Sequence, residues 1–306
     1  MKLLIFGSKG WIGRQFCEYL DNNNILYIES DSRADNEKDV EKEINEYKPT
    51  NIVSFIGRTY GGTFNTIDYL EQPGKLVDNI RDNLYAPMIL SILCERYNIH
   101  YTYMGTGCIF EYGGDGGDEA GGDEGCGEAG GDEGCGEAKK REDDVPNFFG
   151  SSYSIVKGYT DRLQHMYSKN TLNLRIRMPI VNYDHDRNFI TKITKYEYVC
   201  SVANSMTVLP DMFPVIADMI KKNVAGTFNL CNKGAITHNE ILELYKTHVD
   251  NNFTWKNFSI EEQNKVLLSK RSNIELSTDK LYELYPNIPD IRTSIENCMI
   301  TYSRLL

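Results

Sequence analysis

The chain opens with Lys-Leu-Leu-Ile-Phe at residues 2–6, followed at once by Gly7-Ser-Lys-Gly10-Trp-Ile-Gly13. The apolar run predicts a buried strand, and residues 11–20 predict a helix. In a strand–turn–helix of this kind, Gly7 makes the tight turn, Gly10 lets a pyrophosphate approach the backbone, and Gly13 lets the helix pack closely on the strand. The stretch therefore predicts a dinucleotide site at a helix N-terminus. The residues expected to line it are Gly7, Lys9, Gly10, Trp11, Ile12, Gly13 and Gly57.

Strands and helices alternate along the following residues. We expect strands at 26–29, 51–56, 100–104 and 172–177, and helices at 40–47, 78–97 and 153–168. This alternation predicts an α/β fold, a Rossmann-type doubly wound parallel sheet. We place a dinucleotide-binding domain at 1–178 and a smaller C-terminal substrate-binding lobe at 179–306. A strand at 227–230 is expected to return to the first sheet.

One segment interrupts the pattern. Gly-Gly-Asp-Glu-Gly-Cys-Gly-Glu-Ala occurs at 121–129 and again at 130–138, after a degenerate copy at 113–120. A segment this acidic and poor in apolar residues buries too little surface to offset its ordering entropy. We interpret 113–138 as a disordered surface loop that grew by tandem duplication. A metal-binding role is the weaker alternative, and we predict no metal site.

Composition excludes several classes of function. The net charge of −11 is concentrated in the repeat, because the rest of the chain carries 35 acidic residues against 33 basic ones. No basic patch for nucleic acid and no apolar run long enough to span a membrane is visible. The eight cysteines have no metal-ligand spacing, which favours a reduced, cytoplasmic protein over a disulfide framework.

The identity of the dinucleotide depends on charges near the end of the second strand. Glu29 and Asp31 are placed to bind the ribose hydroxyls of NAD. Lys9 and Arg33 are instead suited to a 2′-phosphate. We favour NADPH, with NADH as the alternative; the competing interpretation is that both cations are solvated loop charges.

A set of chemically active side chains follows the fourth expected strand. Tyr153 and Lys157 are four residues apart and so share one face of a helix. With Thr106 at a strand end, they form the proton-transfer set of short-chain dehydrogenases. Cys108 places a thiol two residues from that hydroxyl, where a second acid/base group would serve the same sugar ring. The competing interpretation is a buried, inert cysteine.

These residues resemble the extended short-chain dehydrogenase/reductase family. More narrowly, the chain is similar to the plant-type bifunctional 3,5-epimerase/4-keto-reductases that complete UDP-L-rhamnose synthesis. The matching stretches are Gly-Trp-Ile-Gly at 10–13, Thr-Gly-Cys-Ile-Phe-Glu at 106–111, Arg-Met-Pro-Ile at 177–180, Arg-Asn-Phe-Ile-Thr-Lys-Ile-Thr at 187–194, Asn-Ser-Met-Thr at 204–207, His-Asn-Glu-Ile-Leu-Glu at 238–243, Asn-Phe-Thr-Trp-Lys-Asn-Phe at 252–258 and Arg-Ser-Asn at 271–273. The AT-rich coding bias suggested by the many Asn and Tyr residues would fit a giant-virus version, working in the host cytoplasm.

The resemblance implies a role for each catalytic residue. Tyr153 would protonate the oxygen at C4 as hydride arrives, while Lys157 would lower the Tyr pKa and hold the nicotinamide ribose. Thr106 would hydrogen-bond the sugar oxygen. Asn83 would order a proton-relay water, or else be an ordinary polar helix residue.

Epimerisation needs further groups, because a C4 ketone acidifies the protons at C3 and C5 and the enolate must be reprotonated from the opposite face. The resemblance implies Cys108 and Lys192 for this exchange. His185 is a reserve candidate. Dehydratases of the family carry Asp-Glu after the Thr; here Gly107-Cys108 follows, so we expect the chain to receive the keto sugar and not to make it.

For the substrate, the resemblance implies that Arg271 and Asn188 bind the diphosphate. Trp255 and Asn204 are expected to frame the uracil or the sugar. It also implies a UDP-sugar substrate and a homodimer. The alternatives are a 4-keto reductase without epimerase activity, an enzyme similar to GDP-fucose synthase, and an NADPH-sensing regulator without catalysis.

Overall fold

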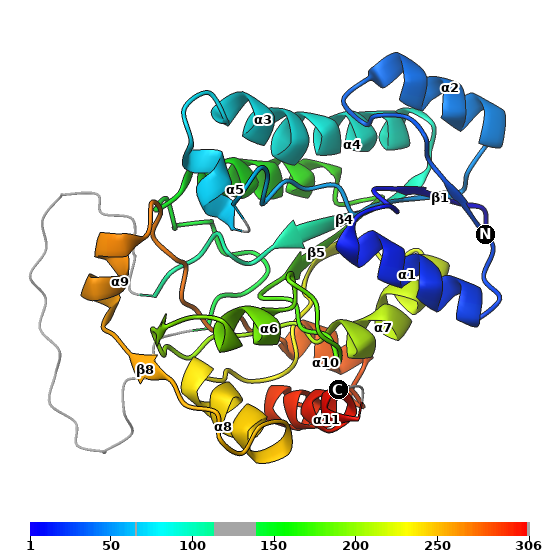
Figure 1. Ribbon diagram of the computed structural model, residues 1–306. Coiled ribbons are helices and arrows are strands. Elements are labelled where there is room, and N and C mark those ends of the chain that lie inside the picture. The colour runs from blue at the N-terminus through cyan, green and yellow to red at the C-terminus, as the bar shows by residue number, and fades with distance from the viewer. Residues whose placement is uncertain (65, 113–138, 305–306) are drawn as a thin grey trace, which may run out of the picture.

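The computed structural model describes residues 1–64, 66–112 and 139–304. Its centre is a parallel sheet in the order β2-β1-β3-β4-β5-β7 (Figure 1). The strands are β1 Leu3–Phe6, β2 Tyr27–Glu29, β3 Asn51–Ser54, β4 His100–Thr106, β5 Thr171–Ile176 and β7 Gly226–Asn229. Strand order reverses between β1 and β3, which makes the carboxyl ends of these strands the expected ligand crevice. The predicted Rossmann-type α/β fold is confirmed.

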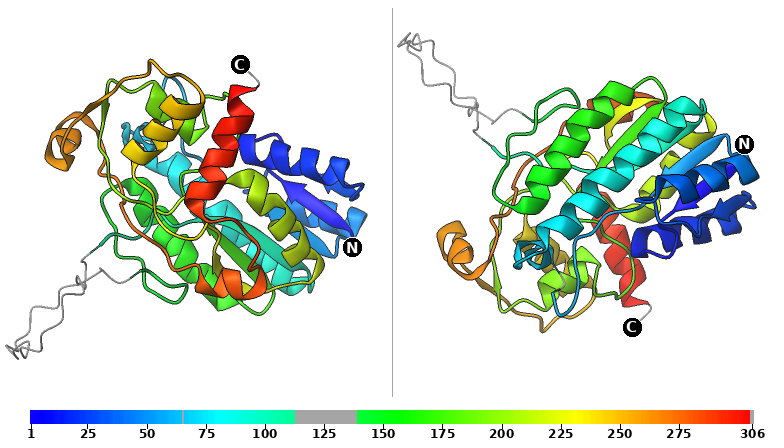
Figure 2. Two further views of the ribbon diagram at one scale, coloured as in Figure 1. Left: turned by 90° about the horizontal axis from the view of Figure 1, so that it is seen from below. Right: turned by 90° about the horizontal axis from the view of Figure 1, so that it is seen from above.

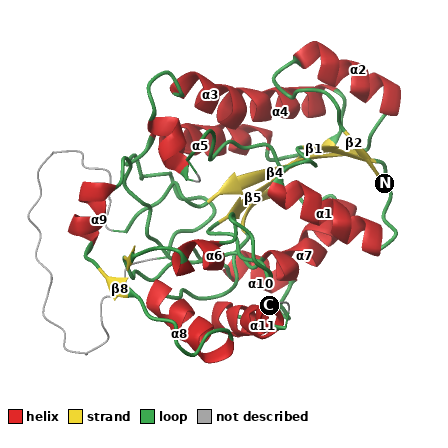
Figure 3. Ribbon diagram, in the orientation of Figure 1, coloured by secondary structure: helices red, strands yellow, loops and turns green. Residues whose placement is uncertain are grey.

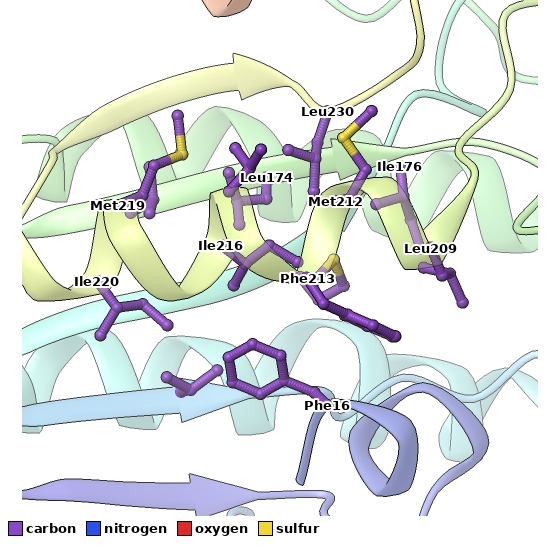
Figure 4. Close-up of a cluster of buried hydrophobic side chains, with 14 of the residues drawn as sticks. Phe16, Leu174, Ile176, Leu209, Met212, Phe213, Ile216, Met219, Ile220 and Leu230 are labelled. Atoms are coloured by element: carbon purple, nitrogen blue, oxygen red, sulfur yellow. The ribbon is translucent and has the colours of Figure 1, made fainter. Parts of the chain in front are cut away.

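Helices cover both faces of the sheet, as the alternation of side chains along β1 requires (Figure 3). Leu3 and Ile5 belong to a core with α1 (Trp11–Asn22) and α7 (Leu209–Lys221), part of which Figure 4 shows. Leu4 and Phe6 belong to a second core with α2 (Glu37–Tyr47) and α4 (Ala86–Arg96). Helix α5 (Ser152–Gln164), continued by η3 (His165–Tyr167), lies beside α4 on that second face (Figure 2).

The helix expected at 78–97 is divided into three parts. It consists of α3 (Leu76–Ile80), a π-helical turn η2 (Arg81–Tyr85) and α4. A π turn shifts the backbone register by one residue and often marks a functional site. Here the turn contains Asn83, one of the predicted catalytic residues.

The C-terminal part has its own core below the carboxyl ends of the strands (Figure 1). Its elements are α6 (Phe189–Thr194), β6 (Tyr198–Val199), α8 (His238–His248), β8 (Lys256–Asn257), α9 (Ile260–Val266) and α11 (Ile291–Ser303), whereas α10 (Asp279–Leu284) packs against β7 and the core of the sheet. Within this half of the sequence, α7 and β7 return to the sheet, as predicted for the strand. The division of the chain at residue 178 stays a prediction.

The repeat at 113–138 lies outside the described residues, so its predicted disorder remains a prediction. Among the residues that are described, no helix is long and apolar enough to cross a membrane.

Candidate active site

The glycine turn after β1 has the geometry that a pyrophosphate needs. Gly7 has a φ of +77°, which disfavours other residues there. A Cβ on Gly13 would lie 2.2 Å from the Gly7 carbonyl oxygen, so the start of α1 can pack this closely only without a side chain. The N–H of Gly10 donates to the same carbonyl at 3.0 Å. Backbone N–H groups at the α1 N-terminus can therefore donate hydrogen bonds to an anion, and the glycine turn at 7–13 fits a dinucleotide.

Cations and carboxylates meet next to this turn, near the end of β2. Lys9 pairs with Asp31 at 3.4 Å, and both side chains are largely exposed. Arg33 binds Asp35 at 2.9 Å and lies 3.6 Å from Asp82. Both cations predicted to bind a 2′-phosphate thus have an acidic neighbour, and neither is buried. The Lys9–Asp31 pair is exposed on both sides and can rearrange at little cost, whereas Arg33 makes two hydrogen bonds to the largely buried Asp35.

The reduction set assembles at the end of β4. Tyr153, from the first turn of α5, is buried and close enough to the side chain of Thr106 for that hydroxyl to lower its pKa. The Thr106 hydroxyl accepts a hydrogen bond from the N–H of Cys108 at 3.1 Å. Burial and the nearby Cys108 raise the pKa of Tyr153, which keeps its proton on the hydroxyl. Three predicted residues therefore converge on one point.

The Cys108 backbone is tied to α5, because Ser154 donates from its hydroxyl to the Cys108 carbonyl oxygen at 2.7 Å. Ser154 is itself held by the N-cap residue Ser151, whose hydroxyl accepts from the Ser154 N–H at 3.0 Å. The Cys108 thiol is partly exposed. This position suits a group that contacts substrate better than it suits a buried structural thiol.

Lys157 lies one turn after Tyr153 and is almost fully buried. Burial lowers its pKa to about 8, against an opposing effect of Asp161 and Cys108. Its ammonium donates to the hydroxyl of Tyr103 at 2.5 Å. Tyr103 is a site residue that the sequence did not single out, because it looks like any apolar residue of a buried strand.

Asn83 holds the loop after β3. Its side chain accepts from the Arg58 N–H and donates to the Arg58 carbonyl oxygen, both at 2.9 Å. Its backbone carbonyl oxygen accepts from Thr160 of α5 at 2.7 Å. A Cβ on Gly57 would lie 3.4 Å from its side-chain oxygen. Asn83 therefore links the cofactor loop to the helix of Tyr153; its role with a relay water stays a prediction.

Lys192 lies on α6 in a group of cations. Burial lowers its pKa, and the neighbouring Arg187 and Arg271 lower it further. Arg187 stacks on the ring of Tyr60, with 3.3 Å from its guanidinium carbon to the ring centroid. Its buried Nη2 has no hydrogen-bond partner among the described residues. Arg187 was missed from the sequence, although the motif that contains Lys192 begins with it.

Arg271 forms an ion pair with the carboxylate of Asp68. Its Nη2 donates to Asp68 at 2.7 Å and its Nη1 to the other oxygen of the same carboxylate at 3.4 Å. Asp68 belongs to η1 (Ile67–Glu71), and Ser269 also donates to it at 2.9 Å. Burial opposes the effect, but the Arg271 guanidinium holds the pKa of Asp68 below its usual value. The guanidinium predicted to bind diphosphate is thus paired within the protein.

Two of the predicted substrate residues have side-chain amides that are hydrogen-bonded inside the protein. Asn188 is fully buried at the N-cap of α6 and donates to the carbonyl oxygens of Val181 and Tyr183 at 3.0 and 2.9 Å. Asn204 is fully buried and accepts from Arg177 at 2.5 Å. These bonds give both amides a structural role, and their predicted contacts with substrate stay predictions.

The two remaining candidates, Trp255 and His185, contact different parts of the chain. Trp255 donates from its indole to Asn239 at 2.9 Å, next to β8 at the outer margin of the lobe (Figure 1). His185 stacks on Trp11 of the glycine turn, with 5.3 Å between ring centroids. Its Nδ1 accepts from the Arg187 N–H at 3.0 Å. His185 therefore joins the cofactor turn to the segment that carries Arg187.

The fold and the site together define a nicotinamide-dependent oxidoreductase of the short-chain dehydrogenase/reductase type. The glycine turn, the reversal of strand order and the Thr106, Tyr153 and Lys157 set are its defining features.

Comparisons with known proteins place the chain more narrowly. Protein L780 of Acanthamoeba polyphaga mimivirus is 51% identical over 96% of both chains. A crystal structure of the L780 UDP-rhamnose synthase from that virus superposes with a TM-score of 0.89 at 49% identity, over 98% of this chain and 99% of that one. A bifunctional dTDP-4-dehydrorhamnose 3,5-epimerase/reductase of Arabidopsis thaliana is 36% identical over 95% of this chain and 90% of its own. No protein-family model matches. The chain belongs to the extended short-chain dehydrogenase/reductase family, among its nucleotide-sugar epimerase/reductases.

Proposed function

We propose that this protein converts UDP-4-keto-6-deoxy-D-glucose into UDP-L-rhamnose by 3,5-epimerisation and NADPH-dependent reduction of the C4 ketone. The observation that carries the proposal is Cys108, a partly exposed thiol beside a Thr106–Tyr153 pair, in a chain with half of its residues identical to those of L780. A plain ketoreductase needs the pair but not the thiol. The crystal structure of L780 carries the name UDP-rhamnose synthase, which supports the same substrate here.

The protein's part in reduction is to deliver a proton. The nicotinamide cofactor, when bound, supplies the hydride that adds to C4. Tyr153 gives its hydroxyl proton to the C4 oxygen, since its raised pKa keeps it protonated until negative charge develops there. Thr106 positions that oxygen by a second hydrogen bond. Lys157, with a pKa of about 8, carries a positive charge over most of the neutral range and favours proton release from Tyr153.

Epimerisation uses the same oxygen in a different way. When a base removes the proton at C3 or C5, the charge moves to the C4 oxygen, where Tyr153 and Thr106 stabilise it. A second group must then return a proton to the opposite face of the ring. Cys108 and Lys192 are the proposed pair. The lowered pKa of Lys192 favours a neutral amine, which can accept a proton.

Cations of the lobe are proposed to hold the diphosphate. Arg271 and Arg187 both lie close enough to Lys192 to lower its pKa, so two guanidinium groups come together from two segments of the chain. The unpartnered Nη2 of Arg187 can donate to a phosphate oxygen without breaking an existing bond. Arg271 must first exchange its bonds to Asp68.

The preference for NADPH over NADH rests on Arg33. Its side chain is 64% exposed next to the end of β2 and can turn toward a 2′-phosphate from its pair with Asp35. Arg33→Ala should lower kcat/KM for NADPH by about tenfold, the loss of one charged hydrogen bond, and leave kcat/KM for NADH unchanged. Equal losses with both cofactors would contradict the preference. We also expect the chain to work in the cytoplasm.

A homodimer is proposed through the helices that cover one face of the sheet. The α3–α4 helix exposes Val77, Ile80, Tyr85 and Ile92, and the adjoining α5–η3 helix exposes Tyr159 and Met166. Two neighbouring helices with apolar exposed stripes are suited to pack against a second copy of themselves. Light scattering should give twice the mass of the chain, and Tyr159→Glu should give the monomer mass. A monomeric wild type would refute the dimer.

Proton exchange in deuterium oxide tests the proposed activity. With UDP-4-keto-6-deoxyglucose and no NADPH, wild type should incorporate deuterium at both C3 and C5, measured by NMR. Cys108→Ala should lose exchange at one carbon or both. Lys192→Arg should do the same, since a guanidinium does not release its proton near neutral pH and so cannot act as the base.

Lys195→Arg is the matched control, because Lys195 lies three residues away and pairs with Asp186 on the surface. It should exchange as wild type does. Full exchange in both Cys108→Ala and Lys192→Arg would remove these two residues from the proposed pair and promote His185. A wild type that reduces the keto sugar but exchanges no proton at C3 or C5 would leave a 4-keto reductase, the main alternative.

A further inference from the structure

Lys157 depends on a residue outside the recognised proton-transfer set. Its ammonium, on α5, is 2.5 Å from the hydroxyl of Tyr103 on β4, and both residues are almost completely buried. Nζ lies 4.6 Å from the centroid of the Tyr103 ring. Tyr103 is three residues before Thr106 on the same strand. The hydrogen bond thus joins the strand that ends in Thr106 to the helix that carries Tyr153.

The groups around this ammonium leave Tyr103 as its main polar partner. Within the described part of the chain, no carboxylate forms an ion pair with Lys157. Asp161, one turn later on α5, is bound by Arg175 through two hydrogen bonds of 2.9 and 2.7 Å and by Asn173 at 2.8 Å. Its charge is therefore largely balanced by Arg175. Cys108 is the other titratable group that acts on the ammonium.

We infer that Tyr103 is a positioning residue, whose hydroxyl takes one of the three N–H groups of Lys157 and directs the other two toward Tyr153 and the cofactor ribose. An ammonium on a flexible stem can rotate freely, and a single fixed acceptor removes that freedom. The inference rests on the proposed function, because it assigns Lys157 the role that the reduction needs. It adds a residue whose contribution is made entirely through Lys157.

The hydroxyl of Tyr103 also stabilises the charged form of Lys157. Removing a hydrogen bond to a charged group disfavours the charge. Tyr103→Phe should therefore lower the pKa of Lys157 further below about 8, while the ring and its contact with the ammonium remain. Affinity for NADPH should fall as the pH rises through the pKa of Lys157, because the neutral amine binds the ribose hydroxyls less strongly. In the variant this fall should begin at lower pH.

The experiment measures the dissociation constant of NADPH from pH 6 to 9.5 by fluorescence, without any sugar. For Tyr103→Phe, the alkaline loss of affinity should move down by about one pH unit, which makes binding several-fold weaker at pH 8. The alkaline limb of kcat for keto-sugar reduction should move in the same direction. At pH 6, where Lys157 is charged in both proteins, the difference should be small.

Tyr101→Phe is the matched control. Tyr101 lies two residues earlier on the same face of β4, is fully buried, and does not bond to Lys157 in the described structure. It should leave both profiles unchanged, and melting temperatures show whether either variant is simply less stable. An unshifted profile in Tyr103→Phe, or an equal shift in Tyr101→Phe, would overturn the inference. A wild type that binds NADPH but does not reduce the keto sugar would instead refute the proposed function, and the binding profile would still test Tyr103.

Discussion

The proposed site has two halves, the reduction set at the edge of the sheet and the cations of the C-terminal lobe, and their polar groups have different partners within the protein. At the edge of the sheet, Thr106 and Tyr153 lie next to each other, and Lys157 bonds to Tyr103, which is part of the same cluster. In the lobe, Arg271 is held by a carboxylate that comes from a distant segment of the chain. The first half is preformed for its chemistry. In the second half, Arg271 would have to exchange its bonds to Asp68 for bonds to the proposed diphosphate.

The difference follows from the chemistry of the two ligands. Reduction needs hydroxyls and an ammonium fixed in position, so contacts that restrict them before substrate arrives are useful. A diphosphate needs concentrated positive charge, which is costly to bury without a counter-ion. Asp68 supplies that counter-ion to Arg271 when no phosphate is present. Asp68 is itself buried, but Arg271 is partly exposed, so a ligand can approach the guanidinium.

The largest effect is expected at the preformed half. Tyr153→Phe should lower the rate of reduction by at least about a hundredfold, the scale for losing a positioned proton donor, while NADPH binding persists. Steady-state kinetics with the keto sugar measures the rate, and fluorescence measures binding. Tyr159→Phe, on the exposed side of the same helix, is the control. A near-normal rate in Tyr153→Phe would show that the edge of the sheet is not the catalytic half.

Substitutions of the two partners in the Arg271–Asp68 ion pair should change KM for the UDP-sugar in opposite directions. Arg271→Ala should raise KM for the UDP-sugar by about tenfold or more, since a charged hydrogen bond to phosphate is lost. Asp68→Asn should lower KM a few-fold, because Arg271 no longer has to leave a carboxylate. If both variants raise KM together, the pair is structural and Arg271 does not exchange partners.

Asn188→Ala separates a structural role from substrate binding. Its side chain makes buried hydrogen bonds to the 181–183 segment, so the free energy of unfolding should fall by about 1–3 kcal/mol. KM for the UDP-sugar should stay within about twofold of wild type. Denaturant unfolding and steady-state kinetics give the two values. A large rise in KM with unchanged stability would restore Asn188 to the substrate site.

The smallest effect is expected from the repeat at 113–138. Its composition cannot support a core, so a short Gly/Ser linker between Tyr112 and Lys139 should leave kcat and the melting temperature unchanged. Thermal unfolding and kinetics check this. A marked loss in either would mean that the repeat contributes to the lobe or to the substrate site.

Sequence reasoning succeeded where a local pattern fixes the geometry. The glycine turn needs no information beyond residues 3–13, because the turn, the helix start and the close packing are all set by neighbours in the chain. Tyr153 and Lys157 share a helix face by their spacing alone. The sequence could not show whether the amides of Asn188 and Asn204 bind substrate or make hydrogen bonds inside the protein. An asparagine in a motif looks the same whether it caps a helix or contacts a ligand.

By itself, the sequence determined the α/β fold, the dinucleotide turn and the residue types of the reduction set. Only the tertiary structure decided which of those groups have partners. Tyr103 meets Lys157 across 54 residues and Asp68 meets Arg271 across 203, and neither pairing follows from any local pattern. The physical reason is that burial and charge pairing depend on which segments the fold brings together. These contacts, and not the motif, set the charge of Lys157 and the availability of Arg271.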